Sequence, residues 1–354
     1  MNPTLKLCLL ALGILLSACS GTPTPAPTAA ALPTAAPTAI PATAVPANTG
    51  TTVGGSKTLH LEIPVDATIS DIPRLMAADS LRTMGYDVQG IDLHDNTLSA
   101  QAIEQGSLDI ALISNPIALG AVQHGAKLVS IVDDSSEQRV FVVTSKVNSC
   151  ADLAGKRLAV PSTTSTQMVM LNRYIDKECP GTTYTQVAMP NVQVRLQGLM
   201  AGQLDGGTAD LPTFQQLQRA QHPDLHILVN FAQEFPGLRG SVYITRRELV
   251  AKNPQAVKDF VRTLLLARRQ LQDPNFLQQQ VVKYLKMSDT DAKQAAADAI
   301  QEKIWDLNGG LTNESVQANL DFLTQANVLK PGLQVSDVAD LTPLMQVLDE
   351  IGRK

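Results

Sequence analysis

The most polar stretch at an expected strand end is Ser162–Thr166, five consecutive hydroxyl residues between a strand and a helix. Free N–H groups at a helix start, with hydroxyl groups beside them, bind anions in a site that the helix dipole favours. Serine and threonine are also preferred N-caps, so plain capping is the alternative. Because five hydroxyl residues exceed what one cap requires, Ser162, Thr163, Thr164 and Ser165 are predicted to contact an anionic group.

Two further polar stretches have the same position, directly after an expected strand. In open α/β sheets a ligand binds beyond the carboxyl ends of the strands. Hydroxyl and amide groups at those ends are therefore predicted to hydrogen-bond to one ligand. They are Thr68 and Ser70, in the loop after the first expected strand, and Ser114 and Asn115, after the strand expected over 108–113.

Two acidic side chains are expected at the same edge. Asp210 ends the strand that follows Leu204, and Glu234 lies with Phe235 in the loop after the strand expected over 225–229. A carboxylate there suits an amine or a ring N–H of a ligand, and a phenyl ring supplies an apolar wall. The alternative for Asp210 is an ordinary turn or helix-cap role. We predict Asp210 and Glu234 as ligand contacts.

The sequence has no motif of the common secreted or nucleotide-binding enzymes, since G-x-S-x-G, H-E-x-x-H and the P-loop are all missing. His222 and His226 have the i, i+4 spacing of a helical metal pair, but Pro223 lies between them and no glutamate does. An aromatic content of 4% argues against a flat, stacking ligand such as a flavin. We therefore expect neither an enzyme, nor a metal site, nor a cofactor.

The first 56 residues differ in character from the rest of the chain. Lys6, an apolar run over 7–16 and the small residues before Cys19 form the pattern of a secretion signal, expected over 1–18. The apolar run is too short for a membrane span, which needs about 20 residues. The stretch 19–56 is dominated by proline, threonine and alanine, which favours an extended tether over a folded core.

The run Leu16-Ser17-Ala18-Cys19 resembles the lipobox of bacterial lipoproteins. The resemblance implies cleavage before Cys19 and acylation of its sulfur. It places the protein outside the cytoplasm, lipid-anchored (palmitate) to a membrane. The sequence does not indicate which membrane holds the anchor.

Cys150 and Cys179 are the two cysteines that remain in the folded part. An even pair in an exported protein is most simply a disulfide. In the chain-entropy model, closing a ring of about 30 residues contributes roughly 3–4 kcal/mol. A metal site or a catalytic thiol is the alternative, but neither cysteine has a CxxC partner or a neighbouring histidine.

The folded part beyond the tether is long enough for two lobes, each with a core. A formal net charge of −5 and the lack of a basic stretch argue against nucleic-acid binding. Strands alternate with helices, which predicts α/β lobes with parallel, doubly wound sheets. The segments Gly106-Ser107-Leu108-Asp109 and Gly202-Gln203-Leu204-Asp205 occupy the same helix–glycine–strand position, so the two lobes are predicted to be built alike.

Two strand-like stretches, 139–144 and 240–245, bracket the second unit and are expected to be the crossings between lobes. After the second crossing the pattern is helical to the end. The predicted limits are 57–144 for the first part of lobe 1, 145–242 for lobe 2, and 243–354 for the return to lobe 1 with the C-terminal helices.

Two of these segments resemble a known family. The run Asp152–Pro161 is similar to the D-L-x-G-K-x-(apolar)-x-V segment of periplasmic solute-binding proteins, and Gly106–Ala111 to their G-x-(V/L)-D-(apolar)-A segment. The branch with the greatest similarity serves importers of nitrate, sulfonate, taurine and thiamine precursors, and the likeness extends from about Leu61 to about Lys303. The chain lacks the cysteine-rich motif of the enzymes that make the thiamine pyrimidine on the same fold.

The resemblance implies a two-lobed type II periplasmic-binding-protein fold with a ligand cleft between the lobes. It also implies a monomer that delivers its ligand to an ABC permease in the membrane. The ligand expected on this basis is a small anionic or zwitterionic organic solute, such as a sulfonate, nitrate or taurine. The alternatives are a pyrimidine, thiamine-precursor or flavin-like ligand, or a ligand-sensing module without transport.

Overall fold

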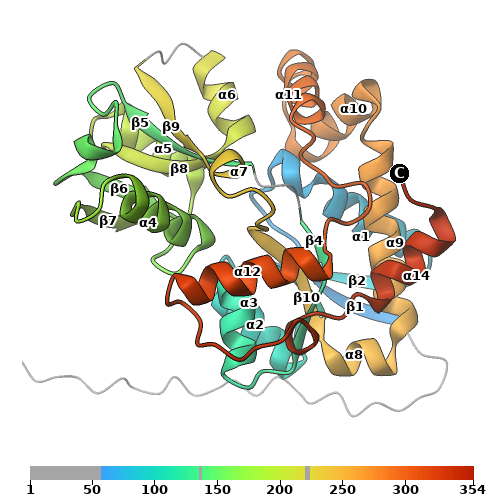
Figure 1. Cartoon of the computed structure of the whole chain (residues 1–354). Coiled ribbons are helices and arrows are strands. Elements are labelled where there is room, and N and C mark those ends of the chain that lie inside the picture. Colours follow the sequence, from blue (N-terminus) through green and yellow to red (C-terminus); the bar gives the residue numbers. More distant parts are fainter. Residues whose placement is uncertain (1–56, 135–137, 220–223) are drawn as a thin grey trace, which may run out of the picture. The chain divides into compact units, whose positions relative to one another are not determined.

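The computed structural model describes residues 57–134, 138–219 and 224–354 (Figure 1). The predicted leader and tether, with Cys19, lie outside these residues. The described part contains two five-stranded sheets, each with helices against its faces. No helix in these three ranges has the length and apolar character that crossing a bilayer requires.

The first sheet has the strand order β2-β1-β3-β10-β4. β1, β2 and β3 are parallel, whereas β10 runs antiparallel to both of its neighbours, β3 and β4. The strands are β1 (Lys57–Glu62), β2 (Tyr86–Ile91), β3 (Ile110–Ser114), β4 (Leu128–Asp133) and β10 (Ser241–Arg246). The helices between them are η1 (Ile69–Asp71), α1 (Ile72–Thr83), α2 (Asn96–Gln105) and α3 (Asn115–Gln123).

The second sheet repeats this plan with the order β7-β6-β8-β5-β9. β6, β7 and β8 are parallel, and β5 runs antiparallel between β8 and β9. The strands are β5 (Arg139–Thr144), β6 (Arg157–Val160), β7 (Thr185–Ala188), β8 (Gly206–Asp210) and β9 (Leu225–Asn230). The helices are η2 (Cys150–Leu153), α4 (Thr166–Glu178), α5 (Val192–Met200), α6 (Leu211–Arg219) and α7 (Phe231–Glu234).

The likeness of the two lobes predicted from the sequence is therefore confirmed at the level of strand order. The prediction of parallel sheets is corrected, because each sheet contains one antiparallel strand. This strand is the one through which the chain enters the sheet when it arrives from the other lobe. β5 follows the first crossing and lies in the second sheet, while β10 follows the second crossing and lies in the first. The residue limits of the lobes stay a prediction, with each crossing strand belonging to the sheet that it enters.

Asp109 and Asp205, the aspartates of the two G-x-L-D segments, make the same hydrogen bonds in their lobes. The Asp109 N–H donates to the His60 carbonyl at 2.8 Å, and the Asp109 carboxylate accepts from the His60 N–H at 2.9 Å. Asp205 makes the matching pair of bonds with Arg157, each at 3.0 Å. Each aspartate thus joins the start of its strand to the neighbouring parallel strand, where regular ladder bonds are only beginning. The aspartates of the G-x-L-D segments thus have a structural role.

We expect Asp109→Ala to lower the free energy of unfolding by about 2–3 kcal/mol, because hydrogen bonds to a charged group are worth more than neutral ones. Asp109 is buried and its carboxylate also accepts from Arg246 at 2.8 Å. Asp205→Ala is the matched control and should cost about 1 kcal/mol, because the Asp205 side chain is 28% exposed and water can replace it. Urea unfolding measures both, and equal losses would contradict the assignment.

Helices α9 and α14 of the C-terminal region pack against the first lobe. Asn253 caps α9 with its side chain and Pro254 is the first helical residue. The apolar face of α9, including Phe260 and Leu264, packs in the core of the first sheet. The helices are α8 (Arg247–Lys252), α9 (Pro254–Gln270), α10 (Pro274–Leu285), α11 (Asp289–Gln301), α12 (Asn313–Gln325), α13 (Val335–Val338) and α14 (Thr342–Ile351).

Helix α12 contacts the cores of both lobes. Val316 and Leu320 are buried in the core of the first lobe, whereas Phe322 also packs against that of the second. Phe322 meets Phe235, which follows α7, in an edge-to-face contact with 5.3 Å between ring centroids. Figure 1 shows α12 extending from the C-terminal region toward α4. The C-terminal helices therefore connect the lobes in addition to the two crossings.

The predicted disulfide is confirmed. Cys150 in η2 is bonded to Cys179, the residue that ends α4, with 5.8 Å between the Cα atoms. The bond joins the segment before β6 to the far end of the helix after it.

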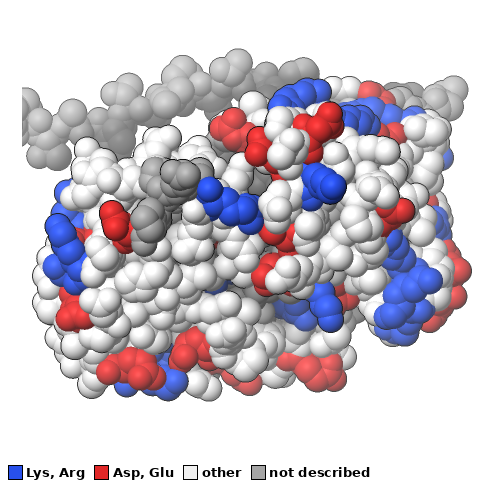
Figure 2. All heavy atoms as spheres, turned by 90° about the horizontal axis from the view of Figure 1, so that it is seen from above, with Lys and Arg blue, Asp and Glu red and all other residues white. Residues whose placement is uncertain are grey.

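Charged side chains of both signs are interspersed over the face of the molecule that Figure 2 shows, without a large basic area.

Candidate functional site

A cavity of about 370 Å³ lies at the strand ends and is lined from both lobes. The first lobe contributes the start of α2, the end of β3 and the start of β10. The second lobe contributes the start of β5 and the loop between β6 and α4. The lining residues are His94, Asp95, Asn96, Thr97, Ser114, Ile117, Arg139, Pro161, Ser162, Thr164, Ser165, Gln167, Pro190 and Ser241. We call this space the interlobe cavity.

Four of the predicted contacts meet here: Ser114 from the first lobe, and Ser162, Thr164 and Ser165 from the second. They are far apart in the chain and come from different sheets. The polar loops at the strand ends are therefore brought together by the way in which the lobes face each other.

Ser114 has an unusual hydroxyl group. Its oxygen is buried and has no hydrogen-bond partner among the described residues. Ser114 occupies the N-cap position of α3, but its side chain makes no capping bond. A buried hydroxyl without a partner costs about 1–3 kcal/mol, so native structures seldom keep one without a reason. A ligand in the interlobe cavity would supply the missing partner.

Arg139 is the one lysine or arginine among the residues that line this cavity. Its guanidinium donates to the hydroxyl oxygen of Ser241 at 3.1 Å. Both residues are the first of their strands, β5 and β10, so they belong to the two crossings. The one acid in the lining, Asp95, accepts from the N–H groups of Thr97 and Leu98 at the start of α2. Arg139 thus brings a positive charge to the lining of the cavity.

The hydroxyl groups of the loop over 162–166 have different contacts. Ser165 caps α4, since its hydroxyl accepts from the Met168 N–H at 3.3 Å and donates to the Ser162 carbonyl at 2.8 Å. The Thr166 hydroxyl donates to the carbonyl of Gly240 in the second crossing. Ser162 and Thr164 face the cavity, whereas Thr163 is exposed and does not line it. Capping thus explains part of the polar run, and hydroxyl groups remain for a ligand.

The predicted loop around Thr68 lies elsewhere. Thr68 lines a second cavity, of about 240 Å³, formed with α5, α6, α10 and α11, and its hydroxyl donates to Asp71 at 3.0 Å. Ser70 lines neither cavity, and its carbonyl accepts from the indole N–H of Trp305. Asn115 is buried and its side-chain amide donates to the Arg239 carbonyl at 2.6 Å. These residues make structural bonds where the structure places them.

The two predicted acids are not among the residues that line the interlobe cavity, although Asp210 is paired with Arg139 in the β5–β8 ladder. Asp210 accepts from the Thr213 N–H at 2.9 Å and so caps α6, which is the alternative that the sequence left open. Glu234 forms an ion pair with Lys177 of α4 at 2.7 Å. Neither residue lines either of the two cavities, and a ligand role for both stays a prediction.

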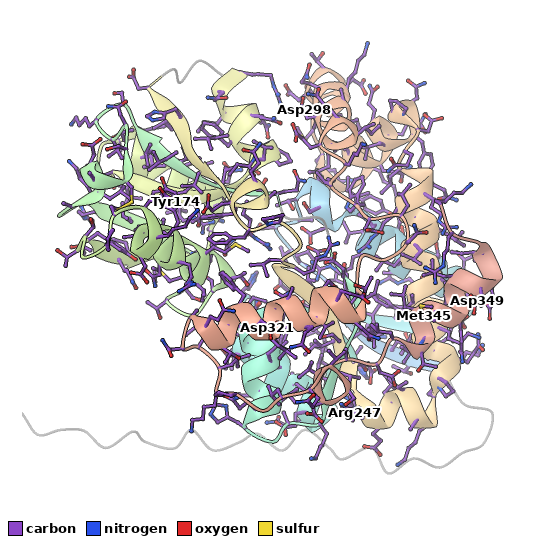
Figure 3. All side chains as sticks on the ribbon, in the orientation of Figure 1. Tyr174, Arg247, Asp298, Asp321, Met345 and Asp349 are labelled. Carbon is purple, nitrogen blue, oxygen red and sulfur yellow. A yellow bond between two sulfur atoms is a disulfide. The ribbon has the colours of Figure 1, made fainter. Side chains whose placement is uncertain are left out.

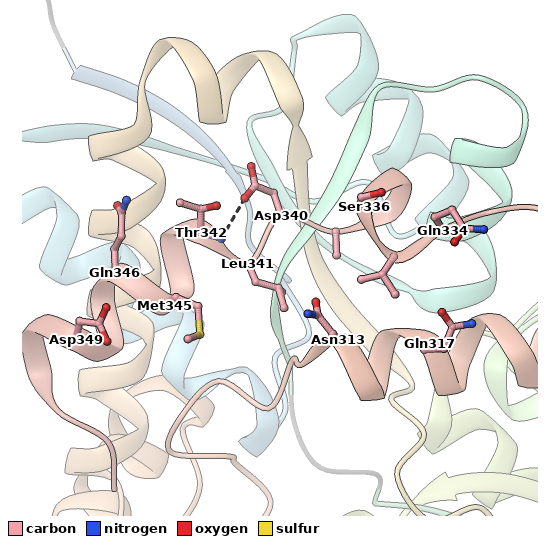
Figure 4. Close-up of a pocket in the computed structure, with 12 residues that line it drawn as sticks. Asn313, Gln317, Gln334, Ser336, Asp340, Leu341, Thr342, Met345, Gln346 and Asp349 are labelled. Carbon is pink, nitrogen blue, oxygen red and sulfur yellow. Dashed lines mark hydrogen bonds between the residues drawn. The ribbon is translucent and has the colours of Figure 1, made fainter.

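A larger cavity, of about 780 Å³, lies between α12, α13 and α14 (Figure 4). Its wall is rich in side-chain amides and acids, such as Asn313, Gln317 and Asp349, with Met345 among them. Asp340, at its rim, accepts from the Thr342 N–H at 3.0 Å. This cavity is lined by C-terminal helices alone, and no strand end reaches it. A ligand held there would not be enclosed by two lobes.

The described residues contain no cluster of three or more histidine, cysteine or acidic side chains arranged to hold a metal ion. His222 and Pro223, which form the doubtful metal motif with His226, lie outside the described ranges. The geometry that remains is a polar interlobe cavity with one cation, several hydroxyl groups and helix starts.

The family model described as NMT1/THI5 like matches residues 81–273, more than half of the chain. The chain belongs to the NMT1/THI5-like family. The match covers β3, both crossing strands and the whole second sheet, so it includes most of the interlobe cavity. A binding protein of Brucella abortus strain 2308 is 26% identical over 261 residues, which is 72% of this chain and 80% of that protein.

Solved structures confirm the expected fold. The alkanesulfonate-binding protein SsuA of Xanthomonas axonopodis pv. citri, bound to MOPS, has a TM-score of 0.65 at 17% identity, over 81% of this chain and 99% of that one. The nitrate-binding protein NrtA of Synechocystis PCC 6803 has a TM-score of 0.62 at 13% identity, over 84% and 89%. A ligand-binding component of an ABC-type importer from Staphylococcus aureus has 0.64 at 16%, over 82% and 97%. The NMT1/THI5-like chain thus has the two-lobed periplasmic-binding-protein fold.

Proposed function

We propose that this protein is the solute-binding component of an ABC import system and holds a small anionic or zwitterionic organic solute in the interlobe cavity. The observation that carries the proposal is the buried hydroxyl of Ser114, which has no hydrogen-bond partner among the described residues, in a cavity that Arg139 also lines. The named ligands of structural relatives, an alkanesulfonate and nitrate, are anions of the kind that such a site would bind. We propose no catalytic step.

The residues present suit an oxyanion. The Arg139 guanidinium offers charge and several N–H donors, and hydrogen bonds between ionised partners are roughly twice as strong as neutral ones. Ser114, Ser162 and Thr164 add hydroxyl donors from the two lobes. The start of α3, which lacks a side-chain cap, adds the positive end of a helix dipole. An anion between the lobes would therefore bond to both and favour their approach.

The lining favours a sulfonate- or nitrate-like solute over a pyrimidine, thiamine precursor or flavin. Flat ring systems usually stack on aromatic side chains, and the residues lining the interlobe cavity include no phenylalanine, tyrosine or tryptophan. A volume of about 370 Å³ is near the lower end for ligand pockets, roughly 300–1,000 Å³. A small solute fits these limits best.

Transport rather than sensing is proposed from the sequence outside the described residues. The lipobox-like run ending at Cys19 is proposed to anchor the protein to a membrane, outside the cytoplasm. The tether over 19–56 would give the lobes reach, and a permease in the same membrane is the proposed recipient. We propose that the binding protein acts as a monomer. A pull-down that recovers a sensor kinase and no permease would favour the sensing alternative.

A thermal-shift screen tests the ligand class. Ethanesulfonate, taurine and nitrate are the expected binders, and a pyrimidine and a flavin are the comparison arms. A ligand present at 100 times its dissociation constant stabilises the folded state by about 2.7 kcal/mol, a readily measured shift. Stabilisation by the ring compounds alone would replace the anion proposal with the alternative.

Arg139→Gln should weaken binding of the best anion about 10- to 100-fold, because a charge-assisted hydrogen bond is worth about 1.5–3 kcal/mol. The matched control is Arg157→Gln, which changes an exposed arginine at the opposite end of β6 from the cavity. Isothermal titration calorimetry measures both variants. An Arg139→Gln protein that binds the anion as tightly as the wild type would refute the assigned site.

Ser114→Ala separates a ligand role from a structural one. We expect affinity for the anion to fall about five- to tenfold, since one hydrogen bond is lost. The ligand-free protein should be as stable as the wild type or about 1 kcal/mol more stable, because a buried hydroxyl without a partner disappears. Chemical denaturation and calorimetry give the two numbers. A structural serine would instead show lower stability with unchanged affinity.

A further inference from the structure

The two lobes also touch far from the crossings along the chain, where α6 faces α11. A nitrogen of the Arg219 guanidinium lies 2.6 Å from a carboxylate oxygen of Asp298. Arg219 belongs to the helix after β8, and Asp298 to the C-terminal helices that return to the first lobe. Figure 3 labels Asp298 on the side of α11 toward α6. This ion pair therefore joins the lobes without passing through a crossing.

Two hydrogen bonds from side-chain amides connect the same elements. The side-chain amide of Gln215 donates to the Glu302 carboxylate at 3.2 Å, and that of Gln138 donates to the Glu302 carbonyl, also at 3.2 Å. Gln215 lies one helical turn before Arg219 on α6, so both side chains lie on one face of that helix. The end of α11 is thus bonded to α6 and to the residue that precedes β5.

The burial of the pair depends on the approach of the lobes. The Asp298 side chain is 11% exposed and that of Arg219 is 39% exposed. Asp298 also accepts from Gln294, one turn earlier on its own helix. Separation of α6 from α11 would expose the Asp298 carboxylate to water and remove its ion pair with Arg219. The pair therefore stabilises the arrangement of the lobes in this structure and not one in which α6 and α11 are apart.

Neither Arg219 nor Asp298 lines the interlobe cavity; both line the second cavity, beside Thr68. A change at the pair does not alter a side chain that lines the interlobe cavity, so we expect it to affect binding there through lobe closure. When the binding-competent state is only partly populated, the apparent affinity falls in proportion to that population. Even a modest ion pair then changes the measured affinity for a solute that it never contacts.

We propose that the Arg219–Asp298 pair, supported by Gln215 and Glu302, is a latch that holds the lobes closed and sets the dwell time of the bound solute. The latch rests on the proposed solute-binding function for its consequence, but its effect on lobe closure can be measured without a solute. Arg219 and Asp298 are positioning residues, because they act on the solute through the lobes. Salt should weaken the latch, since the pair is partly exposed.

The experiment compares Arg219→Gln, Asp298→Asn and the charge-exchanged double variant Arg219→Asp/Asp298→Arg with the wild type. Small-angle X-ray scattering without ligand should give a larger radius of gyration for both single variants, and a value near the wild type for the double variant. Stopped-flow dissociation of ethanesulfonate should be about two- to fivefold faster in the single variants, as the strength of exposed pairs and the population argument together suggest. High salt should shift the wild type and leave the single variants unchanged.

Arg82→Gln is the matched control, because Arg82 is similarly exposed and its ion pair with Asp79 lies within the first lobe. It should change neither the radius of gyration nor the dissociation rate. Unchanged scattering in both single variants, or no rescue in the double variant, would overturn the latch. If scattering changes as expected while ethanesulfonate, taurine and nitrate all fail to bind, the latch stands and the proposed anionic solute is wrong.

Discussion

Replacing Arg268 with leucine should lower the free energy of unfolding by about 3–5 kcal/mol, the usual cost of removing one partner from a buried charge network. Arg268 lies on α9 and is fully buried. Its guanidinium donates to the carbonyls of Asp133, Asp134 and Asp306, and so holds the chain where β4 ends and the first crossing begins. Leucine would remove the Arg268 donors from these three carbonyls, of which those of Asp133 and Asp134 are buried, and would take a cation away from the Asp133 carboxylate.

Urea unfolding at neutral pH, with a check that the slope of the transition is unchanged, measures the loss. Arg247→Leu is the matched control, because Arg247 also donates to two carbonyls, those of Ser336 and Asp337, but is partly exposed (Figure 3). Water can satisfy those carbonyls, so the control should cost about 1 kcal/mol or less. A similar loss in both variants would show that burial does not set the cost.

The second large effect concerns pH. Asp133 is fully buried, and neither of its carboxylate oxygens has a hydrogen-bond partner among the described residues. Burial raises the pKa of Asp133 to about 7, since the loss of hydration outweighs the attraction of Arg239, 3.1 Å away, and Arg268. In the unfolded chain the same carboxyl has an ordinary pKa near 3.8. The folded state therefore binds the proton more tightly than the unfolded state does.

The sign follows from linkage. The stability that comes from protonated Asp133 is fully present below about pH 4 and is lost as the pH rises to about 7. A shift of about three pKa units corresponds to roughly 4 kcal/mol. Asp133→Asn keeps the shape without the charge, so it should match the wild type near pH 4. At pH 8 it should be more stable than the wild type by up to about 4 kcal/mol.

Denaturant unfolding of wild type and Asp133→Asn between pH 4 and pH 8 tests this expectation. The difference between the two proteins cancels the titration of Glu62, whose pKa burial also raises, and reports Asp133 together with its coupling to the neighbouring Asp134. If Asp133→Asn were instead the less stable protein at pH 8, attraction to the two arginines would outweigh burial. Gly310, whose backbone packs against the Asp133 carboxylate, leaves little room for a water molecule there.

The order of the elements could be predicted from the sequence, because the signals are local. Gly106 ends α2 with a positive φ of 82°, Asn253 and Pro254 start α9, and the two cysteines pair as expected. The repeated aspartates predicted two similar lobes, although their role in joining parallel strands became visible only in the structure. Each of these signals depends on residues close in the chain or on a repeated pattern.

The candidate site was predicted only in part, for a physical reason. The rule that ligands bind beyond carboxyl ends of strands indicates Ser114 and Ser162, but it overlooks strands that run the other way. Arg139 and Ser241 begin antiparallel strands, so their amino ends reach the cavity. The relative placement of the lobes, which brings Ser114 together with Ser162 and Thr164, has no local signal. The burial of Arg268 has no local signal either, because its sequence neighbours do not distinguish it from an exposed arginine of a helix.

The disulfide has a consequence for the cavity itself. The ring closed by Cys150 and Cys179 contains β6, the loop with Ser162 and Thr164, and α4. One wall of the proposed binding site is thus held at both of its chain ends by a single covalent bond. In a thiol-rich compartment the Cys150–Cys179 bond would be reduced, and the wall of the cavity would become more mobile before the protein unfolded. The affinity for a solute then depends on the redox potential of the compartment, and the exported, oxidised protein would bind more tightly than reduced protein inside the cell.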